Sequence, residues 1–436
     1  MGRALAPALV SDAGVLGYDD LAAQLPALAG ALSARGVAAG DRVAFVAEAT
    51  VDTALAVHAA WYLGATVVPL HPRLTAGEHA ALLDEARPVH RIDLPLVPGV
   101  PVPVGPAADP LAILFTSGTT GRSKGAVLSA AAFAAAADAS ALNLGWRDDD
   151  RWLLALTPAH VGGLSILIRC LRARRTVVLG PVAPETIARH RVTLVSLVPT
   201  QAQRLLAAGW SPPAHVRALL LGGGPAPPAL LAATDDGGWP VLTTYGLTEA
   251  CAQVTTQRPG TRNRGERGSG PPLPGVGVRI SAAGTIQVGG PTLMTGYLHH
   301  AAPFTEDGWL ETGDVGRLDD AGCLHVLARR SDLIVSGGEN VYPAEVEAVL
   351  LEVPGVTAAC VFGVADEDWG QIVCAALVCQ GQGPDDEAVK MHLAARLAGF
   401  KRPRRVARLD ALSVAGSGKI DRAATAARAR ARLRRL

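Results

Sequence analysis

Helix-forming stretches and short apolar runs alternate along the first part of the chain, and this alternation restricts the fold more than any other feature. Leu21, Leu25, Leu28 and Leu32 recur at helical spacing, and residues 41–49 then form a short run typical of a strand. Strands that are separated by helices usually pair in parallel within one sheet. The sequence therefore predicts a multidomain α/β fold, with ligands bound beyond the carboxyl ends of its strands.

The same alternation continues downstream and then gives way to two other patterns. Four apolar runs each end in a glycine, proline or hydroxyl-bearing loop: residues 175–180, 192–199, 218–224 and 241–246. Beyond residue 265, turn signals and β-branched residues predict antiparallel strands that form a small barrel-like part of the first domain. Helices and strands after residue 333 predict a separate α+β unit. We therefore expect a large N-terminal domain, residues 1–330, and a small C-terminal domain, residues 331–436.

Charge and cysteine content exclude several classes of function for these 436 residues. The chain carries 40 basic and 39 acidic residues, so its formal charge of +1 predicts no general affinity for nucleic acid or anionic membranes. Its six cysteines never reach CxxC spacing and no secretory signal precedes them, which favours reduced thiols in the cytoplasm. The uncharged stretch 152–168 is too short for a membrane span and contains Pro158, Gly162 and Gly163.

A polar loop rich in glycine follows the apolar run 111–115 and has the composition of an anion-binding site. Hydroxyl donors, two glycines that permit close backbone approach and one lysine would converge there on phosphate oxygens. A Walker-type loop needs GxxxxGK[ST], and Ser123 and Gly125 on either side of Lys124 break that pattern. The residues expected to bind phosphate are Thr116, Ser117, Gly118, Thr119, Thr120, Gly121 and Lys124.

The loop reads TSGTTGRSKG and resembles the phosphate loop of the adenylate-forming superfamily, which includes acyl-CoA synthetases, luciferases and peptide-synthetase adenylation domains. Four further segments resemble a second nucleotide loop, a ribose loop, the hinge and a terminal catalytic loop, in the order usual for that superfamily. They are residues 244–250, 309–322, 329–347 and 416–422. The resemblance covers nearly the whole chain and implies a large nucleotide-binding domain with a mobile C-terminal lid.

The resemblance implies roles for individual residues, each of which has a simpler structural alternative. Glu249, with Thr248, would bind Mg²⁺, although a carboxylate at the start of a helix is also common. Asp314 would bind ribose or only complete a turn, and Lys419 would stabilise the reacting phosphate or only lie on the surface. The nucleotide-binding set also includes Gly222, Gly223, Gly224, Tyr245, Gly246, Thr248, Asp314 and Arg329.

The C-terminal motifs depart from the superfamily's pattern at two places. Residues 412–415 stand where many relatives have Pro-x-Thr ahead of the terminal loop, although Lys419 is retained. Ser331 stands where relatives usually have a hinge aspartate or lysine, so we expect the small domain to rotate around Ser331 and Asp332.

The superfamily's reaction has two half reactions, and the resemblance implies which residues take part in each. A carboxylate first attacks ATP, with Mg²⁺, to give an acyl-adenylate and pyrophosphate; the sulfur of coenzyme A then displaces AMP. Lys419, Glu249 and His160 are the expected catalytic residues, with His160 as a gate to the acid pocket, although a lone histidine is more often structural. The expected tunnel for coenzyme A is lined by Gly337 and Gly338.

Residues 158–169 and 197–206, together with the hinge motif and the compact length, resemble the o-succinylbenzoate–CoA ligases of menaquinone biosynthesis. Such an acid carries a second carboxylate and an aromatic ketone, so its pocket needs polar donors or a cation as well as apolar walls. The candidate acid-binding residues are His160, Ser165, Arg169, Gln253, Thr255 and Thr256.

Three other functions stay open at this level: a CoA synthetase for another aryl or medium-chain acid, an adenylation domain that loads a carrier protein, and a catalytically silent nucleotide-binding protein. No carrier segment follows residue 436, which disfavours the second. Retention of Lys124, Glu249, Asp314 and Lys419 disfavours the third. The sequence leaves homo-oligomerisation open.

Overall fold

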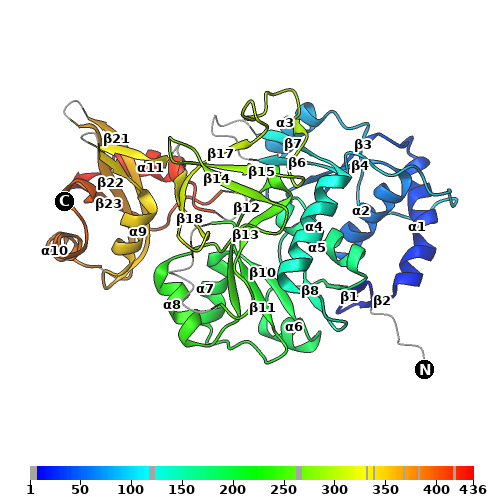
Figure 1. Cartoon of the computed structure of the whole chain (residues 1–436), viewed down its shortest axis with the longest axis horizontal. Coiled ribbons are helices and arrows are strands. Elements are labelled where there is room, and N and C mark those ends of the chain that lie inside the picture. The colour runs from blue at the N-terminus through cyan, green and yellow to red at the C-terminus, as the bar shows by residue number, and fades with distance from the viewer. Residues whose placement is uncertain are drawn as a thin grey trace. The chain divides into compact units, whose positions relative to one another are not determined.

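The computed structural model describes residues 7–116, 123–224, 226–261, 268–329, 332–336, 339–366, 369–381, 383–415 and 419–436, with the side chains of Arg329 and Asn340 left out. Contacts between residues divide the chain into two compact units. The first comprises residues 1–279, 287–312 and 318–325, and the second comprises residues 280–286, 313–317 and 326–436. Figure 1 colours the elements by residue number.

A six-stranded sheet in the first unit has the order β16-β7-β6-β4-β3-β5. Strands β3 to β6 pair in parallel, whereas β7 and β16 are antiparallel to their neighbours. The strands are β3 (Arg42–Val46), β4 (Thr66–Leu70), β5 (His90–Arg91), β6 (Ala112–Thr116), β7 (Lys124–Leu128) and β16 (Gly296–Tyr297). Helices α2 (Val51–Leu63) and α3 (Ala76–Ala86) lie between these strands in sequence, and α1 (Tyr18–Ser33) precedes β3.

An eight-stranded sheet in the same unit has the order β13-β12-β11-β10-β8-β9-β1-β2. Its six inner strands pair in parallel, and β13 and β2 add antiparallel edges. The strands are β1 (Leu9–Ser11), β2 (Gly14–Leu16), β8 (Arg151–Leu153), β9 (Thr176–Val178), β10 (Leu194–Leu197), β11 (Ala218–Leu221), β12 (Val241–Leu247) and β13 (Ala252–Thr256). The predicted α/β fold with largely parallel strands is confirmed.

The eight-stranded sheet is buried on both faces, which explains why its strands read as continuous apolar runs. Leu220 packs into a core shared with the six-stranded sheet, whereas its neighbours Leu219 and Leu221 face a second core. The shared core includes side chains of helices α4 (Ala130–Leu144) and α5 (Val161–Ala173), which lie side by side (Figure 1). The second core includes side chains of α6 (Pro184–Arg189), α7 (Pro199–Ala207) and α8 (Pro228–Asp236).

A third sheet has the order β14-β15-β17-β18, and the division between the two compact units runs through its strands. These strands are β14 (Gly277–Ile280), β15 (Thr285–Gly289), β17 (Leu310–Leu318) and β18 (Leu324–Arg329).

The C-terminal part of the second unit is an α+β structure, as the sequence predicts. Its sheet has the order β20-β19-β22-β23-β24, with β21 paired to β22. Alternate residues of β22 face opposite cores: one core includes α9 and α10, and the other includes α11. The elements are β19 (Ile334–Ser336), β20 (Glu339–Val341), α9 (Pro343–Leu351), β21 (Val356–Asp366), β22 (Gly370–Cys379), α10 (Asp386–Arg396), β23 (Arg405–Arg408), α11 (Arg422–Arg430) and β24 (Arg434–Arg435).

Among the residues that the structure describes, no helix has the length and apolar character needed to cross a membrane.

Candidate functional site

The predicted phosphate loop joins two antiparallel strands of the six-stranded sheet. Strand β6 ends at Thr116 and β7 begins at Lys124, and these two residues are direct partners in the strand register. The hairpin therefore places one hydroxyl and one ammonium group at the same end of the sheet. Ser117, Gly118, Thr119, Thr120 and Gly121 lie outside the described residues.

Glu249 lies in a short 3-10 helix, Thr248–Ala250, between β12 and β13. Tyr297 Oη donates a hydrogen bond of 2.6 Å to Glu249 Oε1, and the backbone N–H of Met294 donates one of 2.8 Å to the Glu249 carbonyl oxygen. Lys124 Nζ lies 5.4 Å from the centroid of the same Tyr297 ring. Two residues predicted for the site, far apart in sequence, therefore contact one side chain that the sequence analysis missed.

The backbone around Glu249 is tightly constrained. A Cβ atom at Gly246 would lie 1.8 Å from the carbonyl oxygen of Ala252, so this position of β12 requires glycine. Cys251 and Ala252 both have positive φ, at 52° and 91°, which is strained for residues that carry a Cβ atom. Such strain is often found where a loop positions a functional group.

A hard oxygen-ligand site for Mg²⁺ fits the residues of this loop. Glu249 supplies a carboxylate and Thr248 a hydroxyl, and both side chains are half-buried. Mg²⁺ usually takes one or two protein carboxylates and completes its shell with water and substrate phosphates. Within the described ranges, no group of three or more His, Cys, Asp or Glu side chains is placed to hold a metal.

The predicted adenine-binding segments are the ends of two neighbouring parallel strands. Gly222 follows β11, and a Cβ atom there would lie 2.6 Å from Thr244 Cγ2 on β12. Gly223 adopts a φ of +76°, and Tyr245 is buried in β12. The glycines therefore allow close packing at these strand ends, and Gly224 next to them has no atom within 4 Å of its Cβ position.

His160 is the N-cap residue of α5 and follows a tight turn that begins after β8. Its backbone N–H donates to the Thr157 carbonyl oxygen at 3.0 Å, and a Cβ atom at Gly163 would lie 2.3 Å from that oxygen. The His160 ring lies 4.9 Å, centroid to centroid, from that of His71, the residue just after β4. Burial lowers the pKa of His71, and the charges of Arg73 and His79 lower it further.

Arg169 lies on α5 and is the most unusual candidate for the acid pocket. Only 3% of its surface is exposed, and its guanidinium carbon lies 5.4 Å from the Trp152 ring centroid. Its Nε and Nη2 atoms are buried and make no hydrogen bond to any residue that the structure describes. Burial lowers the pKa of Arg169 to about 10. A buried cation without compensating bonds is costly, so its side chain is suited to binding an anion.

The other acid-pocket candidates make contacts within the fold. Ser165 is buried, and its hydroxyl donates to the carbonyl oxygen of Gly162 at 3.2 Å. Gln253 accepts from Ser140 Oγ at 2.8 Å and donates to Thr256 Oγ1 at 2.9 Å. Thr255 Oγ1 donates to the Ser269 carbonyl oxygen at 2.9 Å.

The remaining candidates belong to the second unit. Asp314 is buried in β17, and Arg329 is the last residue of β18. Asp332 pairs with Arg422 at 3.3 Å. Lys419 is exposed, and its carbonyl oxygen accepts from the Ala415 N–H at 2.8 Å. Ser331, Gly337 and Gly338 lie outside the described residues.

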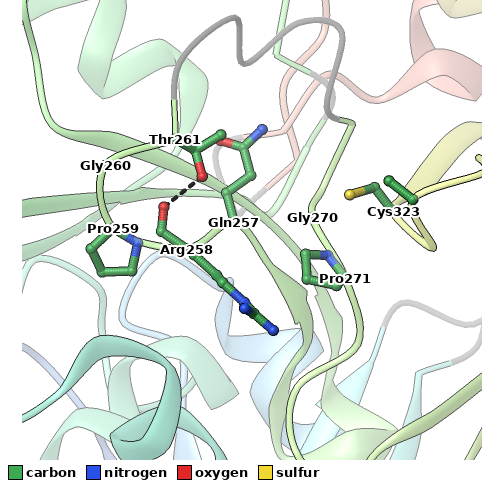
Figure 2. A pocket seen from close by; sticks show the side chains of 9 residues that line it. Gln257, Arg258, Pro259, Gly260, Thr261, Gly270, Pro271 and Cys323 are labelled. Atoms are coloured by element: carbon green, nitrogen blue, oxygen red, sulfur yellow. Dashed lines mark hydrogen bonds between the residues drawn. The ribbon is translucent and has the colours of Figure 1, made fainter.

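A separate cavity of about 430 Å³ contains none of the predicted site residues (Figure 2). Within it, Thr261 Oγ1 donates to the Arg258 carbonyl oxygen at 2.6 Å. Its lining residues are Gln257, Arg258, Pro259, Gly260, Thr261, Gly270, Pro271, Ala321 and Cys323.

The chain matches two known sequence families, and both agree with the nucleotide-binding residues expected at this site. The AMP-binding enzyme family matches residues 3–97 and 91–298, and the AMP-binding enzyme C-terminal domain matches residues 345–419. The chain therefore belongs to the family of AMP-binding enzymes, which confirms the resemblance found in the sequence.

Individual proteins are similar to this chain along most of its length. A 2-succinylbenzoate–CoA ligase of Bacillus licheniformis is 36% identical over 435 residues, which span 90% of this chain and 91% of that protein. The solved o-succinylbenzoate CoA synthetase (MenE) from Bacillus subtilis, in complex with the acyl-adenylate intermediate OSB-AMP, is 34% identical with a TM-score of 0.90. That comparison covers 96% of this chain and 94% of the other. The same enzyme in complex with ATP and magnesium ion is 34% identical, has a TM-score of 0.89 and covers 97% and 96% of the two chains.

Proposed function

We propose that this protein is an ATP-dependent acid–CoA ligase that converts o-succinylbenzoate, ATP and CoA into o-succinylbenzoyl-CoA, AMP and pyrophosphate. The acid would react in two steps, with an acyl-adenylate as the intermediate. Membership of the AMP-binding enzyme family supports the nucleotide chemistry, and the similarity to 2-succinylbenzoate–CoA ligases along most of both chains supports the acid.

In the first step the residues around Tyr297 would hold the nucleotide. Lys124 and the hydroxyl groups of the hairpin would bind phosphate oxygens, and Glu249 with Thr248 would hold Mg²⁺. The metal would neutralise negative charge on the phosphates as pyrophosphate leaves. The strand ends at Gly223, Gly224 and Tyr245 would take the adenine ring, and Asp314 and Arg329 would take the ribose.

The observation that carries the choice of acid is the buried guanidinium of Arg169. One carboxylate of o-succinylbenzoate must react with ATP, so the other needs a cation in the acid pocket. Arg169 lies on the same helix as His160, which we propose as the gate between the acid and the nucleotide. An arginine fork matches a carboxylate in geometry, so Arg169 fits the second carboxylate better than an uncharged acyl tail.

The second unit would supply the adenylation lysine and the path for coenzyme A. Lys419 would stabilise the charge that develops at the α-phosphate, and residues 331–436 would act as a lid that rotates around Ser331 and Asp332. Gly337 and Gly338 would leave room for the pantetheine arm of coenzyme A.

The test is ATP–pyrophosphate exchange across a panel of carboxylic acids, followed by CoA-dependent release of AMP. We expect exchange to be strongest with o-succinylbenzoate. Exchange only with fatty acids would remove this acid from the proposal, and no exchange with any acid would remove the ligase activity.

The lid proposal has its own test. Lys419→Ala should abolish exchange and spare thioester formation from supplied acyl-adenylate. An equal loss of both half reactions would contradict the role of Lys419.

A further inference from the structure

We propose that Tyr297 is a positioning residue that holds Glu249 and Lys124 in place for the metal and the nucleotide. The proposal rests on the function given above, because it assumes that these two residues bind Mg²⁺ and phosphate. Tyr297 contacts both through different parts of one side chain: its hydroxyl donates 2.6 Å to Glu249 Oε1, and its ring centroid lies 5.4 Å from Lys124 Nζ.

The hydroxyl contact fixes the carboxylate without neutralising it. A phenol donates a single proton to one oxygen, so the other oxygen of Glu249 keeps its lone pairs for a cation. Hydrogen bonds to an ionised carboxylate are short and strong, and 2.6 Å is within their range. Partners of this kind orient metal-binding carboxylates and raise the metal affinity of a site.

The ring contact gives Lys124 a partner other than Glu249. An ammonium group is attracted to the face of an aromatic ring. Lys124 and Glu249 are both described, and no ion pair joins them. A direct ion pair would neutralise the charges that Lys124 and Glu249 need for phosphate and Mg²⁺. Contact through Tyr297 instead keeps both charges close together and leaves each able to bind its ligand.

The backbone around Tyr297 holds the ring firmly. Tyr297 on β16 is the register partner of Ala126 on β7, and the Leu298 N–H donates to the Gly125 carbonyl oxygen at 2.8 Å. On the other side, the Met294 N–H donates to the Glu249 carbonyl oxygen at 2.8 Å. The segment therefore ties the strand that begins at Lys124 to the loop that carries Glu249.

Two substitutions separate the two contacts. Tyr297→Phe removes the hydroxyl and keeps the ring, whereas Tyr297→Leu removes both. Tyr18→Phe is a matched control, because Tyr18 Oη lies 2.8 Å from the carbonyl oxygens of both Cys170 and Arg175, which share its single proton, and it contacts neither Glu249 nor Lys124. The measurement is equilibrium binding of ATP by the full chain, by calorimetry over a series of Mg²⁺ concentrations.

We expect Tyr297→Phe to raise the Mg²⁺ concentration for half-maximal ATP binding about tenfold, with little change in ATP affinity at saturating Mg²⁺. Tyr297→Leu should also weaken ATP binding at saturating Mg²⁺ about three- to fivefold, because the ring contact to Lys124 is lost. Tyr18→Phe should leave both quantities unchanged even where it lowers the melting temperature.

A wild-type Mg²⁺ dependence in Tyr297→Phe would overturn the proposal while leaving the ligase function standing. If wild-type protein failed to bind ATP at any Mg²⁺ concentration, the proposed function itself would fail. Should Tyr297→Leu not fold, Tyr297→Phe alone decides, since it preserves the shape of the ring.

Discussion

Two arginines of the first unit, the partly buried Arg217 and the buried Arg169, have different surroundings. Arg217 meets Asp150 with two hydrogen bonds, Nε to Oδ1 at 2.7 Å and Nη2 to Oδ2 at 2.5 Å. It also donates to the carbonyl oxygens of Leu144 at 2.9 Å and Gly145 at 2.6 Å. Asp150 has no exposed surface and further accepts from Thr193 Oγ1 at 2.8 Å. Both charges are thus satisfied within the fold.

Arg169 is more deeply buried than Arg217 and has a different environment. Two titratable groups that act on its pKa are the thiols of Cys170 and Cys251, and burial raises the pKa of both, which keeps them neutral. Its guanidinium carbon lies 5.4 Å from the Trp152 ring centroid, and no carboxylate of the described residues forms an ion pair with it. The difference teaches that burial alone does not assign a role: the guanidinium of Arg217 is satisfied within the fold, whereas Nε and Nη2 of Arg169 have no partner among the described residues, and we predict that Arg169 binds a ligand.

The largest expected effect follows from removing the partner of Arg217. Asp150→Ala leaves the largely buried guanidinium of Arg217 without its carboxylate, and loss of one member of a buried pair typically costs about 3–5 kcal/mol of folding free energy. Guanidinium chloride unfolding, monitored by tryptophan fluorescence, measures the change.

The matched control for Asp150→Ala is Asp138→Ala. Asp138 pairs with Arg172 at 2.9 Å on the surface, with 64% of its side chain exposed, and such pairs contribute at most about 1 kcal/mol. Equal effects of the two substitutions would show that the internal contacts of Arg217 do not distinguish it.

A smaller effect, on catalysis rather than stability, is expected at Arg169. Arg169→Met should lower kcat/KM for o-succinylbenzoate about a hundredfold, or about 2.7 kcal/mol, because a desolvated charge pair with the substrate is lost. It should change kcat/KM little for an analogue that lacks the second carboxylate, and the melting temperature should stay the same or rise. Steady-state kinetics with both acids and a thermal unfolding scan measure these changes.

Arg169→Lys is the conservative control, since it keeps the charge and loses the fork, and it should retain part of the selectivity. If Arg169→Met destabilised the protein as much as Asp150→Ala does, the two arginines would both be structural.

The smallest effect concerns an exposed ion pair in the same unit, Arg279 with Asp307. Arg279 donates to Asp307 at 2.7 and 2.9 Å, and these hydrogen bonds, with one from Thr305, lower the pKa of Asp307 to about 2. A carboxyl pKa that is lower in the folded state adds stability above the unfolded value near 4, and this stability is lost as pH falls through 2. Asp307→Asn should therefore be slightly less stable than wild type at pH 6, with the difference disappearing toward pH 2. Urea unfolding at several pH values measures it, and a difference independent of pH would argue against the ion pair.

The sequence predicted those parts of the fold that depend on local pattern. Apolar runs such as 218–221 are strands because neighbouring residues face cores on opposite sides of the sheet, and the helices between them begin at recognisable caps such as Thr50, whose hydroxyl accepts from the Thr53 N–H. A loop between residues 116 and 124 was predictable because its glycines and hydroxyl groups are contiguous, and its binding of phosphate stays a prediction. The family of the chain was predictable because five such segments occur in the expected order.

The contacts that separate structural from functional residues were not predictable in this way. Ser140 and Gln253 are 113 residues apart, and only their hydrogen bond shows that Gln253 has partners within the fold. Tyr297 lies in a short strand, and the residues next to it in the sequence do not indicate that its side chain contacts Lys124 and Glu249.

The sequence alone determined the class of enzyme, because glycine spacing, hydroxyl groups and apolar periodicity act over a few residues and are written contiguously. Tertiary structure alone decided which polar side chains are satisfied within the fold and which are not. The sequence around Arg169 and Arg217 does not distinguish them, since each directly follows an apolar residue, Ile168 or Val216. Burial and hydrogen bonding are properties of the surroundings, and for both arginines those surroundings include residues distant in the chain, Cys251 for Arg169 and Asp150 for Arg217.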